Sequence, residues 1–122
     1  MKQHHVAIIA AERDRTAAFY ETLGFHIVTE TDRPQKHDRM LWMTDGDTTL
    51  EIFIKPDAPE RPTQPEAFGL RHLAFRPDDL DRLVAQLMQN GYEPEPIRRD
   101  SMTGERMTFV KDPDGLPIEL HE

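Results

Sequence analysis

Two histidines and two glutamates occupy matching places in the two halves of the chain. His5 opens the segment His-Val-Ala-Ile-Ile, and 67 residues later His72 opens His-Leu-Ala-Phe-Arg. Glu51 lies in Leu-Glu-Ile and Glu119 in Ile-Glu-Leu, which are 46 and 47 residues after the respective histidines. Imidazole nitrogens and carboxylate oxygens are common ligands of divalent metals. The pattern therefore predicts a metal site built by an internal repeat.

The apolar neighbours of these residues favour the same interpretation. Glu51 lies in Thr-Thr-Leu-Glu-Ile-Phe-Ile and Glu119 in Leu-Pro-Ile-Glu-Leu, so both carboxylates are expected to face the protein interior. An ionised carboxylate that is buried without a partner is strongly unfavourable. Alone, a strand histidine is more often structural, and a buried glutamate more often pairs with arginine or lysine. Four such residues at equivalent positions of a repeat favour a shared cation.

Size and composition exclude several classes of function. The chain has 122 residues, no cysteine and a formal net charge of −8. Without cysteine there are no disulfides, no thiolate metal ligands and no cysteine nucleophile. The acidic charge argues against nucleic acid and anionic membrane surfaces as partners. No apolar run is long enough to cross a bilayer and no signal-peptide pattern is visible, so a cytoplasmic location is expected.

The expected secondary structure repeats as two βαβββ modules in a single domain over residues 1–122. Module 1 covers about 3–56, with strands at 3–10, 25–31, 39–44 and 48–55 and a helix between Asp14 and Gly24. Module 2 covers about 69–122, with strands at 70–76, 92–98, 105–111 and 116–121 and a helix from Asp78 or Asp79 to about Asn90. Residues 57–68 are predicted to be a linker, because four prolines occur in or just before this segment, at positions 56, 59, 62 and 65. The predicted class is α+β, with curved mixed sheets that form a metal-binding cleft.

Several of these segments resemble the vicinal oxygen chelate superfamily, the glyoxalase/bleomycin resistance/dioxygenase family. The segments are the strand at His5 followed by Ala-Ala-Phe-Tyr-Glu-Thr-Leu-Gly-Phe, Leu-Glu-Ile-Phe at Glu51, Gly-Leu-Arg-His-Leu-Ala-Phe at His72, and Asp-Pro-Asp-Gly-Leu-Pro-Ile-Glu-Leu at Glu119. The resemblance spans essentially the whole chain and is nearest to small bacterial glyoxalase-like proteins. It implies that His5, Glu51, His72 and Glu119 bind one divalent metal ion (Ni²⁺, Zn²⁺, Co²⁺, Mn²⁺ or Fe²⁺) per site.

The resemblance also implies an activity. A glyoxalase-like lyase or isomerase is expected to act on a small oxygen-chelating substrate through a metal-stabilised enediolate. By analogy Glu119 is the candidate catalytic base and Glu51 the second candidate. A homodimer is implied, and the metal site is compatible with one chain or with a dimer interface. Ile9 stands where glyoxalase I has an arginine and Lys55 where it has an asparagine, so lactoylglutathione is not the expected substrate.

Two other functions on the same scaffold stay open. One is a metal-dependent dioxygenase or resistance enzyme, and the other is a non-catalytic small-molecule-binding protein. Retention of all four candidate ligands favours the lyase over both, because bleomycin-binding relatives typically lose these positions and dioxygenases use one glutamate.

The remaining candidates concern the substrate pocket. Arg106 is a candidate for binding a substrate anion, with a surface ion pair as the alternative. Phe53 and Phe109 are candidates for lining the cleft, with packing as the alternative. Trp42, with neighbouring methionines, is an apolar wall or a core residue. His121 has no matching partner in the repeat and is expected to be exposed or structural, and strand alternation is expected to turn His4 away from the His5 side.

Overall fold

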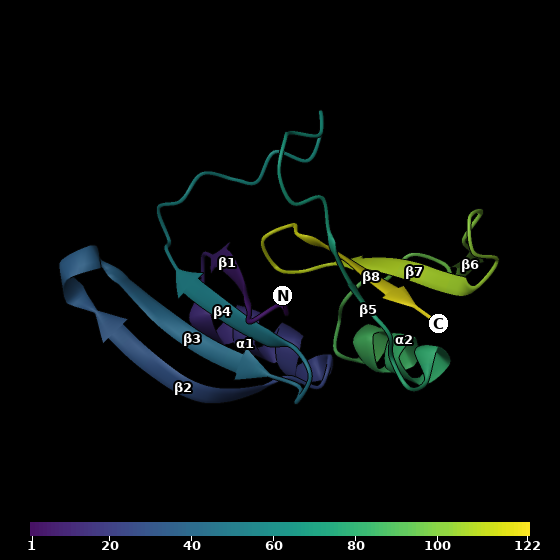
Figure 1. The fold of residues 1–122 in the computed structure, drawn as a ribbon, viewed down its shortest axis with the longest axis horizontal. Coiled ribbons are helices and arrows are strands. Elements are labelled where there is room, and N and C mark those ends of the chain that lie inside the picture. The colour runs from purple at the N-terminus through teal and green to yellow at the C-terminus, as the bar shows by residue number, and fades with distance from the viewer. The chain divides into compact units, whose positions relative to one another are not determined.

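The structure is a computed structural model that describes all residues, Met1–Glu122. It divides into two compact units, Met1–Glu60 and Arg61–Glu122, and the boundary falls inside the expected linker. Each unit contains one four-stranded mixed sheet and one α-helix (Figure 1). The predicted α+β class is confirmed, while the union of both units in a single domain stays a prediction.

The first unit follows the expected βαβββ order. Its elements are β1 (Val6–Ala10), α1 (Arg13–Thr22), β2 (His26–Arg33), the short 3-10 helix η1 (Pro34–Lys36), β3 (Asp38–Thr44) and β4 (Thr49–Ile54). The strand order in the sheet is β1-β4-β3-β2, with β1 parallel to β4 and the other neighbours antiparallel.

One face of this sheet packs on α1 and the other stays open. Along β4, Leu50, Ile52 and Ile54 are buried, whereas Glu51 and Phe53 alternate with them and are half-exposed. Because side chains alternate between the two faces of a strand, the apolar core holds β4 so that Glu51 projects from the open face.

The second unit repeats this plan. Its elements are β5 (Leu73–Phe75), α2 (Leu80–Gln89), β6 (Arg98–Arg99), β7 (Arg106–Lys111) and β8 (Pro117–His121), in the strand order β5-β8-β7-β6. The expected cap of α2 is confirmed, because the Asp79 side chain accepts a hydrogen bond of 3.0 Å from the backbone N–H of Arg82. Leu80 and Leu87 are the buried residues of its apolar stripe.

Three expected strands are clearly shorter than predicted, and one of them is the strand at 70–76, which is reduced to β5, Leu73–Phe75. The strand expected at 92–98 is reduced to β6, because Pro94 and Pro96 lack the N–H groups that a ladder needs. One ladder-like bond remains there, from Glu95 N to the carbonyl of Phe109 at 2.8 Å. In the first unit β1 begins only at Val6, so the residues before it are outside the strand.

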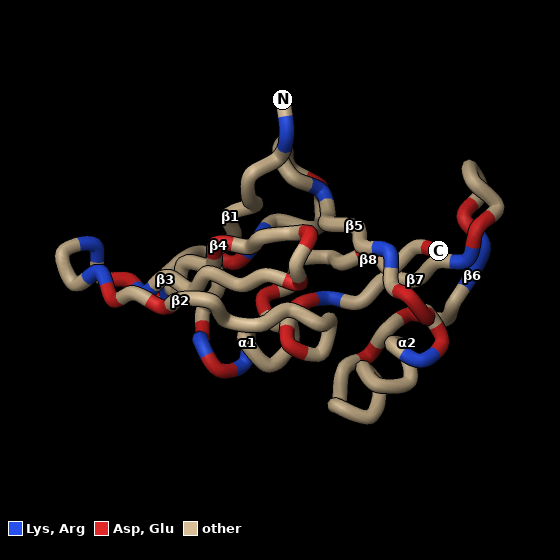
Figure 2. Tube along the Cα trace, turned by 60° about the horizontal axis from the view of Figure 1, so that its bottom comes forward, with Lys and Arg blue, Asp and Glu red and all other residues tan.

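Charge is distributed over both units. Acidic and basic residues gather toward the tip of the β2–β3 hairpin, and acidic residues occur in both units (Figure 2). No helix of the structure combines the length and apolar character required to span a membrane.

Candidate functional site

The repeat brings His5 and Glu51 together in the first unit. Ala7 of β1 is the register partner of Glu51 on the parallel strand β4, and His5 precedes Ala7 by two residues. This places both side chains over the same end of the open sheet face. His5 Nε2 lies 3.3 Å from Glu51 Oε2.

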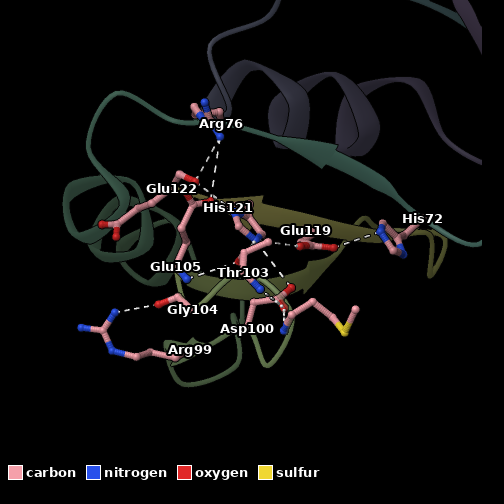
Figure 3. Close-up of polar contacts among 11 residues, drawn as sticks. His72, Arg76, Arg99, Asp100, Thr103, Gly104, Glu105, Glu119, His121 and Glu122 are labelled. Atoms are coloured by element: carbon pink, nitrogen blue, oxygen red, sulfur yellow. Dashed lines mark hydrogen bonds and ion pairs between the residues drawn. The ribbon is translucent and has the colours of Figure 1, made fainter.

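The second unit reproduces this pair. Ala74 of β5 is the register partner of Glu119 on β8, and His72 again precedes the alanine by two residues. His72 Nε2 lies 2.9 Å from Glu119 Oε2 (Figure 3). Glu119 is buried, with only 9% of its surface exposed. Both predicted pairs are therefore formed, each within its own unit.

An aromatic ring lies beside each histidine. Trp42 on β3 is the register partner of Glu51, and its ring centroid is 5.2 Å from that of His5. Phe109 on β7 is the register partner of Glu119, and its centroid is 5.3 Å from that of His72. The two aromatic residues thus hold equivalent places in the repeat. Each ring therefore packs beside the imidazole of its own unit.

An ion-pair network surrounds the buried Asp38 in the first unit. Asp38, whose side chain is fully buried, accepts two hydrogen bonds of 2.7 Å from Arg33 and lies 3.2 Å from Lys55 Nζ. The hydrogen bonds from Arg33 lower the pKa of the Asp38 carboxyl to about 2. The charge of Lys55 is therefore directed to Asp38, and the guanidinium of Arg33 lies 4.6 Å from the Phe53 ring centroid.

Arg106 is held by two carboxylates. Its guanidinium lies 2.6 Å from Asp81 Oδ1 and 3.0 Å from Glu122 Oε1. The hydrogen bond from Arg106 lowers the pKa of Asp81. Binding of a substrate anion, the role predicted for Arg106, would compete with these contacts.

His4, which strand alternation was expected to turn away, contacts His5. The Nδ1 atoms of the two rings are 2.8 Å apart. Because β1 begins at Val6, the alternation of a strand does not apply to these two residues. The contact leaves His5 Nε2 directed at Glu51 and restrains the ring from its other nitrogen.

His121, which has no counterpart in the repeat and was expected to be exposed or structural, contacts several polar groups. Its Nε2 lies 3.6 Å from Asp100 Oδ2 and 3.9 Å from Glu119 Oε1, while its Nδ1 lies 2.9 Å from the carbonyl oxygen of Glu122 (Figure 3). The hydrogen bond to that carbonyl raises the pKa of His121, and the nearby carboxylates raise it further. The signal was present in the sequence, since residues 119 and 121 share a face of one strand.

The donor chemistry of the two pairs fits a divalent metal. Each pair directs an imidazole nitrogen and a carboxylate oxygen at one another, and the ion-pair partners of Glu51 and Glu119 are histidines alone, with no lysine or arginine among them. His72 Nδ1 is buried without a hydrogen-bond partner, so the only polar contact of this ring is with Glu119. Neutral imidazole and carboxylate are the ligand types that such metals take in proteins.

Comparisons with known proteins find relatives that match over nearly the whole chain. The uncharacterized protein YwkD of Bacillus subtilis is 48% identical over 121 residues, covering 98% of this chain and 94% of that protein. The crystal structure of a glyoxalase family protein from Enterococcus faecalis matches with a TM-score of 0.93 and 50% identity, covering 99% of this chain and 97% of its own.

A characterised enzyme is a more distant relative. The trypanothione-dependent glyoxalase I of Leishmania major matches with a TM-score of 0.75 and 28% identity, covering 97% of this chain and 84% of its own. The family model for the Glyoxalase/Bleomycin resistance protein/Dioxygenase superfamily matches residues 2–120. With the repeated His/Glu pairs and the repeated sheets, this match shows that the chain belongs to the Glyoxalase/Bleomycin resistance protein/Dioxygenase superfamily.

Proposed function

We propose that the protein is a divalent-metal-dependent lyase or isomerase of the glyoxalase type, with His5, Glu51, His72 and Glu119 as metal ligands. The observation that carries the proposal is the repeated pair, with nitrogen-to-oxygen distances of 3.3 Å in one unit and 2.9 Å in the other. Neither carboxylate has a lysine or arginine as its ion-pair partner, and Glu119 is buried, so a bound cation would offset the cost of its buried charge. Each pair supplies half of the ligand set.

The bound ion would supply Lewis acidity, which lowers the barrier to removing a proton next to a carbonyl group of the substrate. The protein's own contribution is to accept and return that proton, and Glu119 is the first candidate for this role. His72 Nε2 lies 2.9 Å from Oε2 of Glu119, and His121 Nε2 lies 3.9 Å from Oε1, so both oxygens are positioned by histidines. Glu51 is the second candidate and is the more exposed of the two. The rings of Trp42 and Phe109 restrict water beside the histidines.

The substrate is proposed to be a small compound with two adjacent oxygens, or a thiol adduct other than lactoylglutathione. Ile9 projects from the open face of β1 with 56% of its surface exposed, so an apolar side chain stands where an arginine would be needed. The ammonium group of Lys55 forms an ion pair with Asp38 at 3.2 Å, and substrate binding would compete with this contact. The relative from Leishmania is described as trypanothione-dependent, which supports a different thiol as an option within the family. Phe53 and Phe109 remain the proposed substrate contacts, whereas the contacts of Arg106 with Asp81 and Glu122 favour the surface ion pair, the alternative for that residue.

Metal retention tests the proposal directly. Protein purified without chelators is expected to carry a divalent ion, and Glu51→Gln and His5→Gln are each expected to weaken its retention. Asp47→Asn, an exposed carboxylate in the β3–β4 turn, is the control. Unchanged metal affinity in both site variants, measured by calorimetry, would refute the ligand assignment.

Turnover separates the proposed lyase from the other two functions. Metal-loaded protein is to be assayed with methylglyoxal and a series of thiols, including glutathione as the expected poor substrate, and with small 2-hydroxycarbonyl compounds. Oxygen uptake with catechols would show that the protein is a dioxygenase and not a lyase. Tight ligand binding without turnover would show that it is a binding protein. A homodimer is part of the proposal, and sedimentation equilibrium measures it.

A further inference from the structure

A second group of potential ligands surrounds Glu119. Asp100, Glu119 and His121 each offer one ligand atom, and these atoms all lie within 4.8 Å of one another. Asp100 follows β6, while the other two residues lie on β8 and share one of its faces. Figure 3 shows Glu119 between His72 on one side and His121 on the other.

Asp100 is oriented by its own loop. Its Oδ1 accepts hydrogen bonds from the backbone N–H groups of Met102 at 2.6 Å and Thr103 at 3.2 Å. Its backbone N–H donates to the carbonyl of Glu105 at 2.9 Å. These bonds use Oδ1 and leave Oδ2 directed at His121, at 3.6 Å. One carboxylate oxygen is therefore placed toward the group by backbone contacts.

His121 is oriented in the same sense. The 2.9 Å contact of Nδ1 with the carbonyl oxygen of Glu122 requires that Nδ1 carry the hydrogen. A second contact, between Nε2 and Thr103 Oγ1 at 3.3 Å, is consistent with Nε2 as an acceptor. Metal-binding histidines commonly donate the N–H of the non-ligating nitrogen to a carbonyl or carboxylate, which fixes the ring and its tautomer. His121 has this arrangement, and its lone pair faces both carboxylates.

The charge of the group is not balanced by any permanent cation. Oε2 of Glu119 faces His72 at 2.9 Å and Oε1 faces His121 at 3.9 Å, and the ion-pair partner of Asp100 is also His121. Neither carboxylate contacts a lysine or arginine, in contrast to Asp38, which has Arg33 and Lys55. Two partly buried carboxylates whose ion-pair partners are imidazoles favour the binding of a cation.

We propose that Asp100, Glu119 and His121 form a second divalent-cation site, and that the two oxygens of Glu119 link it to the His72 pair. Two carboxylates and one imidazole suit Zn²⁺, Mn²⁺ or Co²⁺, with water in the remaining positions. The site lies wholly within the second unit and needs neither His5 nor Glu51. It goes beyond the proposed function, because it places a further cation beside the carboxylate proposed as base.

Two variants remove the proposed ligand atoms and keep the structural contacts. Asp100→Asn retains an oxygen that can accept from Met102 and Thr103. His121→Asn retains a donor near the position of Nδ1 and removes Nε2. Binding of Zn²⁺ is to be measured by calorimetry and elemental analysis after gel filtration, with Co²⁺ absorption as a second readout of ligand number. Far-UV circular dichroism checks folding, and His26→Asn on β2 is the control.

The expected result is one more bound ion in the wild type than in either variant, with the His26 control unchanged. Equal stoichiometry and equal affinity in the wild type, Asp100→Asn and His121→Asn would overturn the second site. The proposed function fails separately, if His5→Gln and Glu51→Gln leave binding unchanged. Loss of an ion only in the Asp100 and His121 variants would support the second site and reject the first.

Discussion

Glu119→Gln distinguishes the effect of a buried negative charge on stability from the role of that charge in metal binding. The side chain is 9% exposed and its ion-pair partners are His72 and His121. The amide has almost the same size and can still hydrogen-bond His72, but it has no charge. In metal-free protein the free energy of unfolding is expected to stay within about 1 kcal/mol of the wild type, because a weakened hydrogen bond is offset by relief of the buried charge.

In the presence of metal, the wild type should become more stable than Glu119→Gln. An ion at 100 times its dissociation constant stabilises the folded wild type by about 2.7 kcal/mol. For a chain of this length each kcal/mol shifts the melting temperature by about 4 °C, so the wild type is expected to gain about 11 °C. Glu119→Gln should lose most of this gain, because Glu119 belongs to both proposed cation sites.

The assay is a pair of thermal melts, with Zn²⁺ and with chelator, for the wild type, Glu119→Gln and a control. Asp112→Asn is the matched control, since Asp112 is buried in the same unit and its Oδ1 accepts hydrogen bonds from Asp114 N and Leu116 N. This variant should keep the metal-dependent gain whatever its own stability. An equal gain in Glu119→Gln and the wild type would refute metal binding by Glu119, and a large loss of metal-free stability would show that the carboxylate is structural.

Three further outcomes follow from the first unit. Arg33 lowers the pKa of Asp38 from 3.8 to about 2, so the stability from this ion pair is present above pH 3.8 and is lost as the pH falls toward 2. Urea midpoints measured against pH should show this acid-side loss in the wild type and a smaller loss in Asp38→Asn. An equal loss in the variant would assign the effect to another carboxylate. Trp42 is the only tryptophan and lies 5.2 Å from His5, so Co²⁺ should quench its fluorescence, and quenching that persists in His5→Gln would place the ion elsewhere. Leu41 is fully buried, so Leu41→Ala should cost about 2–5 kcal/mol in urea unfolding, and a loss under about 1 kcal/mol would contradict the packing described for this core.

Much of the fold was readable from local patterns. Apolar alternation, glycine helix stops and the turn at Asp45-Gly46-Asp47 are set by neighbouring residues, and these elements were predicted close to their observed bounds. Strand ends were less predictable, because a strand ends where its partner stops offering hydrogen bonds. The segment at 92–97 was predicted as strand although Pro94 and Pro96 remove donors.

The sequence by itself indicated the two His/Glu pairs, because the repeat gives each half a histidine just before its first strand and a glutamate in its last strand. It did not reveal the partners that arrive from other strands and loops. Trp42 and Phe109 reach the histidines through antiparallel register, and Asp100 reaches His121 through a loop. These contacts join residues far apart in the chain, and only the tertiary structure decided them, because register and loop closure depend on how the whole sheet packs.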